Sequence, residues 1–154
     1  MRSAYSERLF AWLEPVALGA LGAVIGWITA EFVGKPVRAF FDLKKECIET
    51  LIHFGNVSAL PVELRSNMFR PRDPQVEAIK KRLADAREAF RKCGSRLQAF
   101  AETETLAVVA LGAIGYKPRE AGRGFIGLSA SIGDEGATLH GNRVLIEHAL
   151  RMDH

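Results

Sequence analysis

The chain has 154 residues and a net charge of +3, and 48% of its residues are hydrophobic and 25% charged. These proportions are ordinary for a folded protein and argue against disorder. So mild a positive charge falls well short of a nucleic-acid-binding surface, and we expect no nucleic-acid partner. The only cysteines, Cys47 and Cys93, are too few for a disulfide framework.

Residues 15–30, PVALGALGAVIGWITA, form an uncharged run near the N-terminus. Apolar residues continue on both sides of it, and about 20 helical residues cross a hydrocarbon layer roughly 30 Å thick. We therefore predict one transmembrane helix over roughly residues 11–33. Two alternatives are a signal peptide cleaved near Ala30 and a helix buried in a soluble core.

Basic residues flank this run unevenly. Two precede it and four follow it closely: Arg2 and Arg8, then Lys35, Arg38, Lys44 and Lys45. The positive-inside rule therefore places the C-terminal part in the cytoplasm, by a modest margin. Residues 1–34 hold two Arg and three Glu, so residues 35–154 carry a net charge of +4, which favours contact with anionic lipid.

Small residues share one face of the predicted transmembrane helix. Gly22 and Gly26 form a GxxxG motif, and Gly19 lies beside them. Small residues let two helix backbones approach closely in lipid, so we expect this face to form a homo-oligomer contact. The alternative is that glycine is simply common in membrane helices.

The sequence Gly34-Lys35-Pro36 predicts a helix break, because glycine ends helices and proline continues them poorly. A second helix follows over about residues 37–54, with an apolar face at steps of three and four. The members of this face are Phe40, Leu43, Cys47, Leu51 and Phe54.

Residues 58–73 contain two prolines and predict an irregular connection. Its three arginines, Arg65, Arg70 and Arg72, flank Met68 and Phe69. Together with Lys35 and Arg38, they are candidate contacts for anionic lipid or an acidic ligand. The alternative is a solvated, charged loop.

Asp73-Pro74 is a strong helix start, and a 3-4 spacing of apolar residues continues from there for three and a half heptads. The residues of this spacing are Val76, Ile79, Leu83, Ala86, Phe90, Cys93, Leu97 and Phe100. They predict a helix of about 25 to 30 residues that packs in a bundle. Each cysteine lies on an apolar stripe, so we expect both to be small buried hydrophobes.

Residues 103–114 include LAVVALGAI, which is too short to span a membrane. We expect a fully buried helical segment there, with contact to lipid as the alternative. A further helix is predicted over about residues 119–132, then a turn at 133–136 and a short terminal helix. No strand pattern competes, so the predicted fold is all-α, a transmembrane helix followed by a small antiparallel helical bundle.

Gly122, Gly124 and Gly127 match the GxGxxG pattern of dinucleotide-binding loops, and Glu147 follows at twenty residues. That chemistry requires a strand before the motif and more sheet after it. Too little chain remains to complete a parallel sheet, so we interpret the glycines as sites of close helix packing. The histidines lack metal-ligand spacing, and we expect no catalytic residue, cofactor or metal.

The span followed by FFDLKKECIETLIHFGNVS, with the later FIGLSASI and a short terminal helix, resembles small uncharacterised bacterial inner-membrane proteins. The resemblance covers most of the length and carries no activity. It implies one N-terminal transmembrane helix (residues 1–34 with its tail) and a helical cytoplasmic domain (residues 35–154).

These observations lead us to expect a non-enzymatic, membrane-anchored protein that acts through contact with an unknown protein partner and through self-association. One alternative is a signal-responsive, membrane-perturbing effector such as a toxin or immunity component. Another is a nucleotide-binding enzyme that uses the glycine-rich segment.

Overall fold

The computed structural model describes residues 18–55, 74–132 and 137–152. These ranges are helical and contain no strand. The elements are the π-turn η1 (Ala30–Gly34) and the helices α2 (Lys35–His53), α4 (Pro74–Thr103), α5 (Thr105–Ala113), α6 (Pro118–Ser131) and α7 (Ala137–Ala149). The prediction of an all-α fold with a helical bundle is confirmed.

The predicted break at Gly34-Lys35-Pro36 is wrong. One helix of 36 residues runs from Leu18 to His53, and the π-turn lies within it. The Lys35 N–H bonds to the Ala30 carbonyl, five residues back, and Pro36 follows in the first turn of α2. Proline has no N–H to donate, and its ring crowds the preceding turn of a helix. The wider π-turn gives room for the ring of Pro36, so the helix continues. The predicted division between residues 34 and 35 therefore falls inside a continuous helix, and as a domain boundary it stays a prediction.

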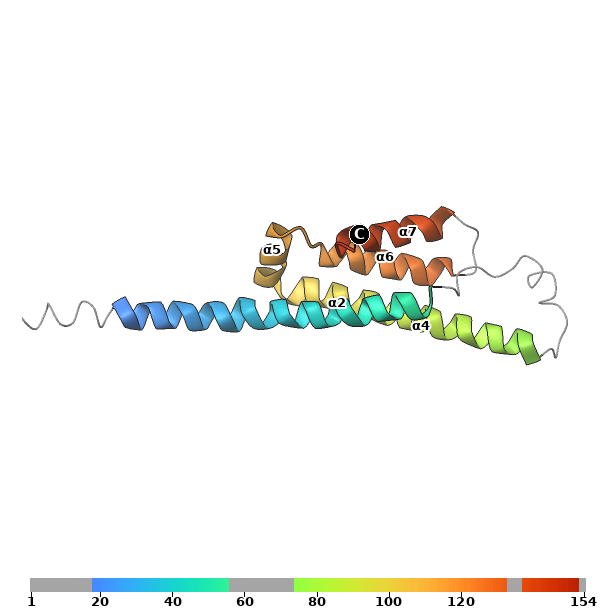
Figure 1. Ribbon diagram of the computed structural model, residues 1–154, viewed down its shortest axis with the longest axis horizontal. Coiled ribbons are helices and arrows are strands. Elements are labelled where there is room, and N and C mark those ends of the chain that lie inside the picture. The colour runs from blue at the N-terminus through green and yellow to red at the C-terminus, as the bar shows by residue number, and fades with distance from the viewer. Residues whose placement is uncertain (1–17, 56–73, 133–136, 153–154) are drawn as a thin grey trace, which may run out of the picture.

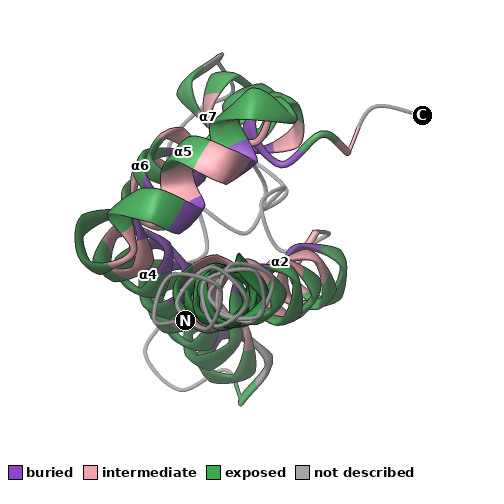
Figure 2. Ribbon diagram, turned by 90° about the vertical axis from the view of Figure 1, so that its left-hand side faces the viewer, coloured by how far each residue is buried: buried purple, intermediate pink, exposed green. Residues whose placement is uncertain are grey.

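Helices α2, α4, α6 and α7 lie alongside one another in alternating directions (Figure 1). Helix α6 packs between α4 and α7, and α2 packs against α4. The short helix α5 lies at the end of the bundle from which residues 18–34 project, and it contacts η1 (Figures 1 and 2). This end of the bundle is called the proximal end below.

The core follows the predicted stripes. In α2, Phe40, Leu43, Cys47 and Leu51 are buried. The α4 spacing is also confirmed, with five buried members, Ala86, Phe90, Cys93, Leu97 and Val76. The position of Leu83 in the middle of the spacing predicts strong burial, but its side chain is only partly buried. The first α4 residue within the main core cluster is Ala86, and Leu83 packs against the edge of that cluster.

The prediction that residues 103–114 are fully buried is wrong. In α5 the Ala107 and Leu111 side chains are buried, whereas Leu106 and Val109 are exposed. Because almost every residue of this segment is apolar, its sequence cannot indicate which face packs inward. The predicted helix at 119–132 and the terminal helix are confirmed as α6 and α7. Predictions were also made for residues 1–17, 58–73 and 133–136. All of these residues lie outside the described ranges.

Candidate membrane interface

The apolar half of the long helix is not covered by the described part of the chain. Every residue from 18 to 30 is exposed, including the large side chains of Leu18, Leu21, Val24, Ile25, Trp27 and Ile28. This helix is long and apolar enough to cross a membrane. The alternative of a helix buried in this bundle's own core is excluded for the described residues. We refer to residues 18–34 as the projecting segment.

Gly19, Gly22 and Gly26 lie on an open part of the projecting segment. A Cβ atom built on any of the three would meet nothing within 4 Å. The open space leaves room for the backbone of another helix to approach, as close helix contacts in lipid require. The predicted oligomer contact needs a second copy of the chain, and it stays a prediction.

Charged and aromatic side chains gather where the projecting segment joins the bundle. The Lys35 Nζ atom lies 2.6 Å from Glu31 Oε1, across the π-turn. Arg38 is exposed one turn further along, and Trp27 is exposed one turn before Glu31. Arg65, Arg70 and Arg72, the other predicted basic contacts, lie outside the described residues. Trp and basic side chains are typical of the boundary between lipid and water.

The GxGxxG glycines are helix-packing positions, as interpreted from the sequence. All three lie within α6. A Cβ on Gly122 would lie 3.0 Å from the Gly94 carbonyl oxygen on α4, and one on Gly124 would lie 2.7 Å from Ile146 Cγ1 on α7. A Cβ on Gly127 would lie still closer, 2.5 Å from Asn142 Oδ1 on α7. The missing side chains let α6 approach both neighbours, and no strand precedes the motif among the described residues.

Glu147, which would hold the ribose in a dinucleotide site, instead pairs with an arginine of its own helix. Its Oε1 atom accepts a hydrogen bond of 2.9 Å from Arg143 Nε one turn earlier in α7. The arrangement around the glycine motif therefore offers a helix contact in place of a phosphate-binding loop.

Cys47 of α2 and Cys93 of α4 are both buried, as predicted, and both are free thiols. The two side chains also hydrogen-bond to each other, a pairing that sequence reasoning missed. Hydrogen bonding with the Cys47 side chain, and to a smaller extent with that of Thr50, lowers the pKa of the Cys93 thiol to about 7. The same hydrogen bond to Cys93, together with burial, raises the pKa of Cys47 far above its ordinary value.

The Glu46 and Arg96 side chains form an ion pair beside the two thiols and link the same two helices. Cys47 and Glu46 lie on α2, beyond the projecting segment, so this contact joins the long helix to the bundle core. The sequence places each cysteine on the apolar stripe of its helix, and this is the one sequence signal from which their pairing could have been predicted.

Among the described residues, no group of three or more His, Cys, Asp or Glu side chains could hold a metal ion. His53, His140 and His148 are exposed and separate. The Ser129 and Ser131 hydroxyls donate to carbonyls of their own helix, at Ile126 (2.7 Å) and Gly127 (2.8 Å). Within the described ranges, the candidate site residues are thus brought together at the α6 contacts and at the thiol pair.

No protein-family model, curated protein or solved structure matches this chain. The resemblance to small bacterial inner-membrane proteins therefore stays a prediction, and the candidate site is argued from geometry alone.

Proposed function

We propose that the chain is a single-pass protein of the bacterial inner membrane, with a transmembrane helix over roughly residues 11–33. One observation carries the proposal. The same helix packs against the bundle along α2, whereas its apolar side chains are exposed along the projecting segment. Exposed apolar area costs about 25 cal/mol per Å² in water, so a long bare stretch needs lipid or protein to cover it. Trp27 and the Glu31–Lys35 pair then lie at the membrane boundary.

The bundle is proposed to face the cytoplasm. Lys35, Arg38, Lys44 and Lys45 follow the projecting segment, and such residues are retained on the cytoplasmic side. The Cys47 and Cys93 thiols agree with this side, since a reducing compartment keeps thiols free. The proposed role is contact with a protein partner and with further copies of the chain. It includes no catalysis, cofactor or nucleic acid.

Anchoring is tested by fractionation of the full chain. We expect it to sediment with membranes and to resist extraction by carbonate and by high salt. A chain that begins at Lys35 should be soluble or should leave the membrane in salt, because only basic residues would hold it. N-terminal sequencing of the mature protein provides the control, since processing near Ala30 would replace the anchor with a cleaved leader.

Self-association is tested on the isolated anchor, residues 1–38, beside the full chain. Gly22→Ile and Gly26→Ile place a large side chain where the backbones would approach, so each should reduce energy transfer between labelled copies in vesicles. Leu21→Ile is the matched control on another face and should change nothing. A monomeric parent anchor, or isoleucine variants that associate as well as the parent, would remove the oligomer contact from the proposal.

A further inference from the structure

Helix α5 exposes an apolar face that the described chain leaves uncovered. Leu106 is 62% exposed and Val109 68%, and Ile114, directly after the helix, is 50% exposed. The opposite face is packed, with Ala107 and Leu111 fully buried. No charged residue occurs between Glu104 and Lys117. A helix on the surface of a soluble bundle normally turns polar residues outward, so this outward face points to an apolar environment.

The position of α5 connects this face with the projecting segment. Helix α5 contacts η1 and the start of α2. In Figure 2, which looks along the molecule from the side of the N-terminus, α5 lies across the proximal end of the bundle. The apolar face of α5 therefore lies beside the point where the long helix changes from bare to packed.

Several contacts hold α5 in this place. The Tyr116 ring, just after the helix, packs edge-on against Phe40 and Phe41 of α2, with ring centroids 5.5 Å apart in both pairs. The Lys117 N–H donates to the Ala149 carbonyl of α7 at 3.0 Å. The segment directly after α5 is thus attached to both α2 and α7, which fixes the position of the helix on the bundle.

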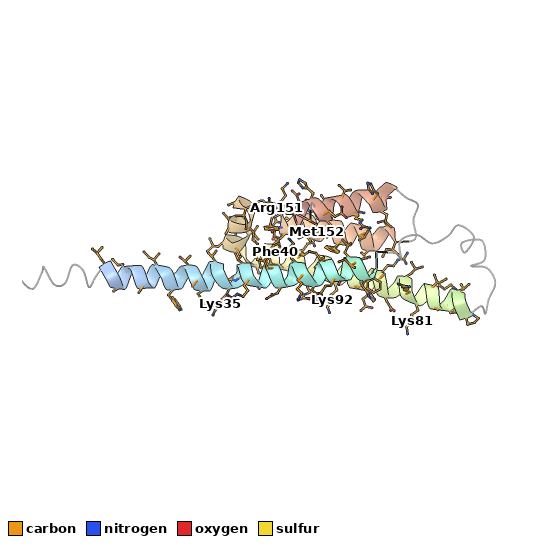
Figure 3. All side chains as sticks on the ribbon, viewed as in Figure 1. Lys35, Phe40, Lys81, Lys92, Arg151 and Met152 are labelled. Atoms are coloured by element: carbon orange, nitrogen blue, oxygen red, sulfur yellow. The ribbon has the colours of Figure 1, made fainter. Side chains whose placement is uncertain are left out.

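Basic side chains lie at the same end of the molecule as the apolar face. The Arg151 guanidinium donates to the Ile114 carbonyl at 2.6 Å, beside the residue that ends the apolar face. Figure 3 shows Lys35 and Arg151 toward the proximal end, whereas Lys81 lies toward the other end. Lys117 adds a further basic group, paired with Glu120 at 3.2 Å. An apolar patch with a basic side chain at one end fits the boundary between acyl chains and anionic headgroups.

We infer that α5 is an interfacial helix whose face of Leu106, Val109 and Ile114 lies in the bilayer surface beside the transmembrane helix. This assignment rests on the proposed function, because it requires the projecting segment to be in the membrane. With two attachments, the bundle keeps a fixed orientation against the bilayer. The occupant of the face is lipid, because the face adjoins a segment long and apolar enough to span a bilayer.

The test measures quenching of a single tryptophan by lipids that carry bromine on their acyl chains. In the full chain, Trp12 and Trp27 are replaced by Phe, and tryptophan is introduced by Val109→Trp on α5 or by Val144→Trp on α7. Both valines are exposed, so both variants should fold, which circular dichroism verifies. Leu106→Trp is a second variant on the α5 face. A chain that keeps Trp27 as its only tryptophan reports on the projecting segment.

In vesicles of zwitterionic and anionic lipid, we expect brominated chains to remove most of the fluorescence at positions 109 and 106, and to leave position 144 unchanged. If positions 109 and 106 behave like 144 while Trp27 is quenched, α5 does not touch lipid and the inference fails, although the anchor stands. Emission at 109 that depends on protein density and not on bromine would show a second copy on this face, and would also overturn it. If Trp27 is not quenched, the projecting segment is not in the bilayer, and the proposed transmembrane anchor fails as well.

Discussion

The two halves of the helix Leu18–His53 share one continuous backbone and have opposite surroundings. In α2, four apolar side chains form a buried stripe in the bundle, and most of the opposite face is charged, with Phe41 and Ile52 as exposed apolar exceptions. In the projecting segment, apolar residues occupy the whole circumference down to Glu31, and every residue from 18 to 30 is exposed. Phe32 is 54% exposed and Phe40 is fully buried, although only two turns separate them.

The comparison shows that the angular distribution of apolar residues, more than their number, determines how much of a helix the bundle covers. A stripe can be satisfied by one neighbouring helix. A helix that is apolar all round needs an apolar environment on every side, which one small bundle cannot supply. Helix α5 is an intermediate case, with one face in the core and an equally apolar face outside.

The largest expected effect comes from comparing two of the phenylalanines of the long helix, one in each half. Phe40→Ala leaves a cavity between α2, Phe100 and Tyr116, whose rings it contacts, and should lower the free energy of unfolding by about 3–5 kcal/mol. Phe32→Ala should lower it far less, because that side chain lies outside the core. Thermal unfolding in detergent micelles, followed by circular dichroism, measures both. Equal losses would show that the bundle extends over residue 32 and that the two halves are not distinct.

A second pair of variants compares glycines that the structure places in opposite surroundings. A Cβ on Gly122 would lie 2.8 Å from Gln98 Cγ and 3.0 Å from the Gly94 carbonyl, so α4 and α6 must separate. Gly122→Ala should therefore destabilise the fold by about 1–3 kcal/mol. Gly141 in α7 meets nothing within 4 Å, and Gly141→Ala should stabilise by about 0.5–1 kcal/mol through helix propensity alone. Shifts of the melting temperature in the same direction would contradict the close α4–α6 contact.

Much of this fold follows from local periodicity in the sequence. The α2 and α4 stripes were predictable because burial repeats at helical spacing, and each helix needs only one apolar face to be recognised. The bare run before Glu31 was predictable because its length and lack of charge are visible directly. The interpretation of Gly122, Gly124 and Gly127 as packing positions is also confirmed, and it was predictable because no strand pattern precedes the motif.

The rest depends on distances between segments far apart in the sequence. The helix continues past Pro36 because a π-turn absorbs the proline, a local adjustment that propensity rules do not anticipate. The outward face of α5 has no charged residue to identify it, so its exposure emerges only once α2 and α4 are placed. The contacts of Phe40 with Tyr116 and of Cys47 with Cys93 join segments more than forty residues apart.

The last expected effect concerns the two thiols that join the long helix to the bundle. The pKa of Cys93 is about 7 in the folded chain and has its ordinary value of 9.0 when unfolded, while the pKa of Cys47 is raised in the folded chain. Between pH 7 and 9 the unfolded chain therefore holds one more proton than the folded chain, and stability rises with pH. Above pH 9 the unfolded chain loses both protons while folded Cys47 keeps its own, so stability falls again.

Denaturant unfolding in micelles under reducing conditions, at intervals from pH 6 to 10, measures this effect as a shallow stability maximum near pH 9. Cys93→Ser is the matched control, because it removes the easily ionised thiol and keeps a hydroxyl for Thr50 and Cys47 to contact. The two chains differ only at residue 93, so the difference between the two profiles isolates the thiol pair. Glu46 and Arg96 face the pair from α2 and α4 and are unchanged by the substitution. Parallel profiles would show that Cys93 ionises no more easily than an ordinary thiol, and the pair would then join the two helices by packing alone.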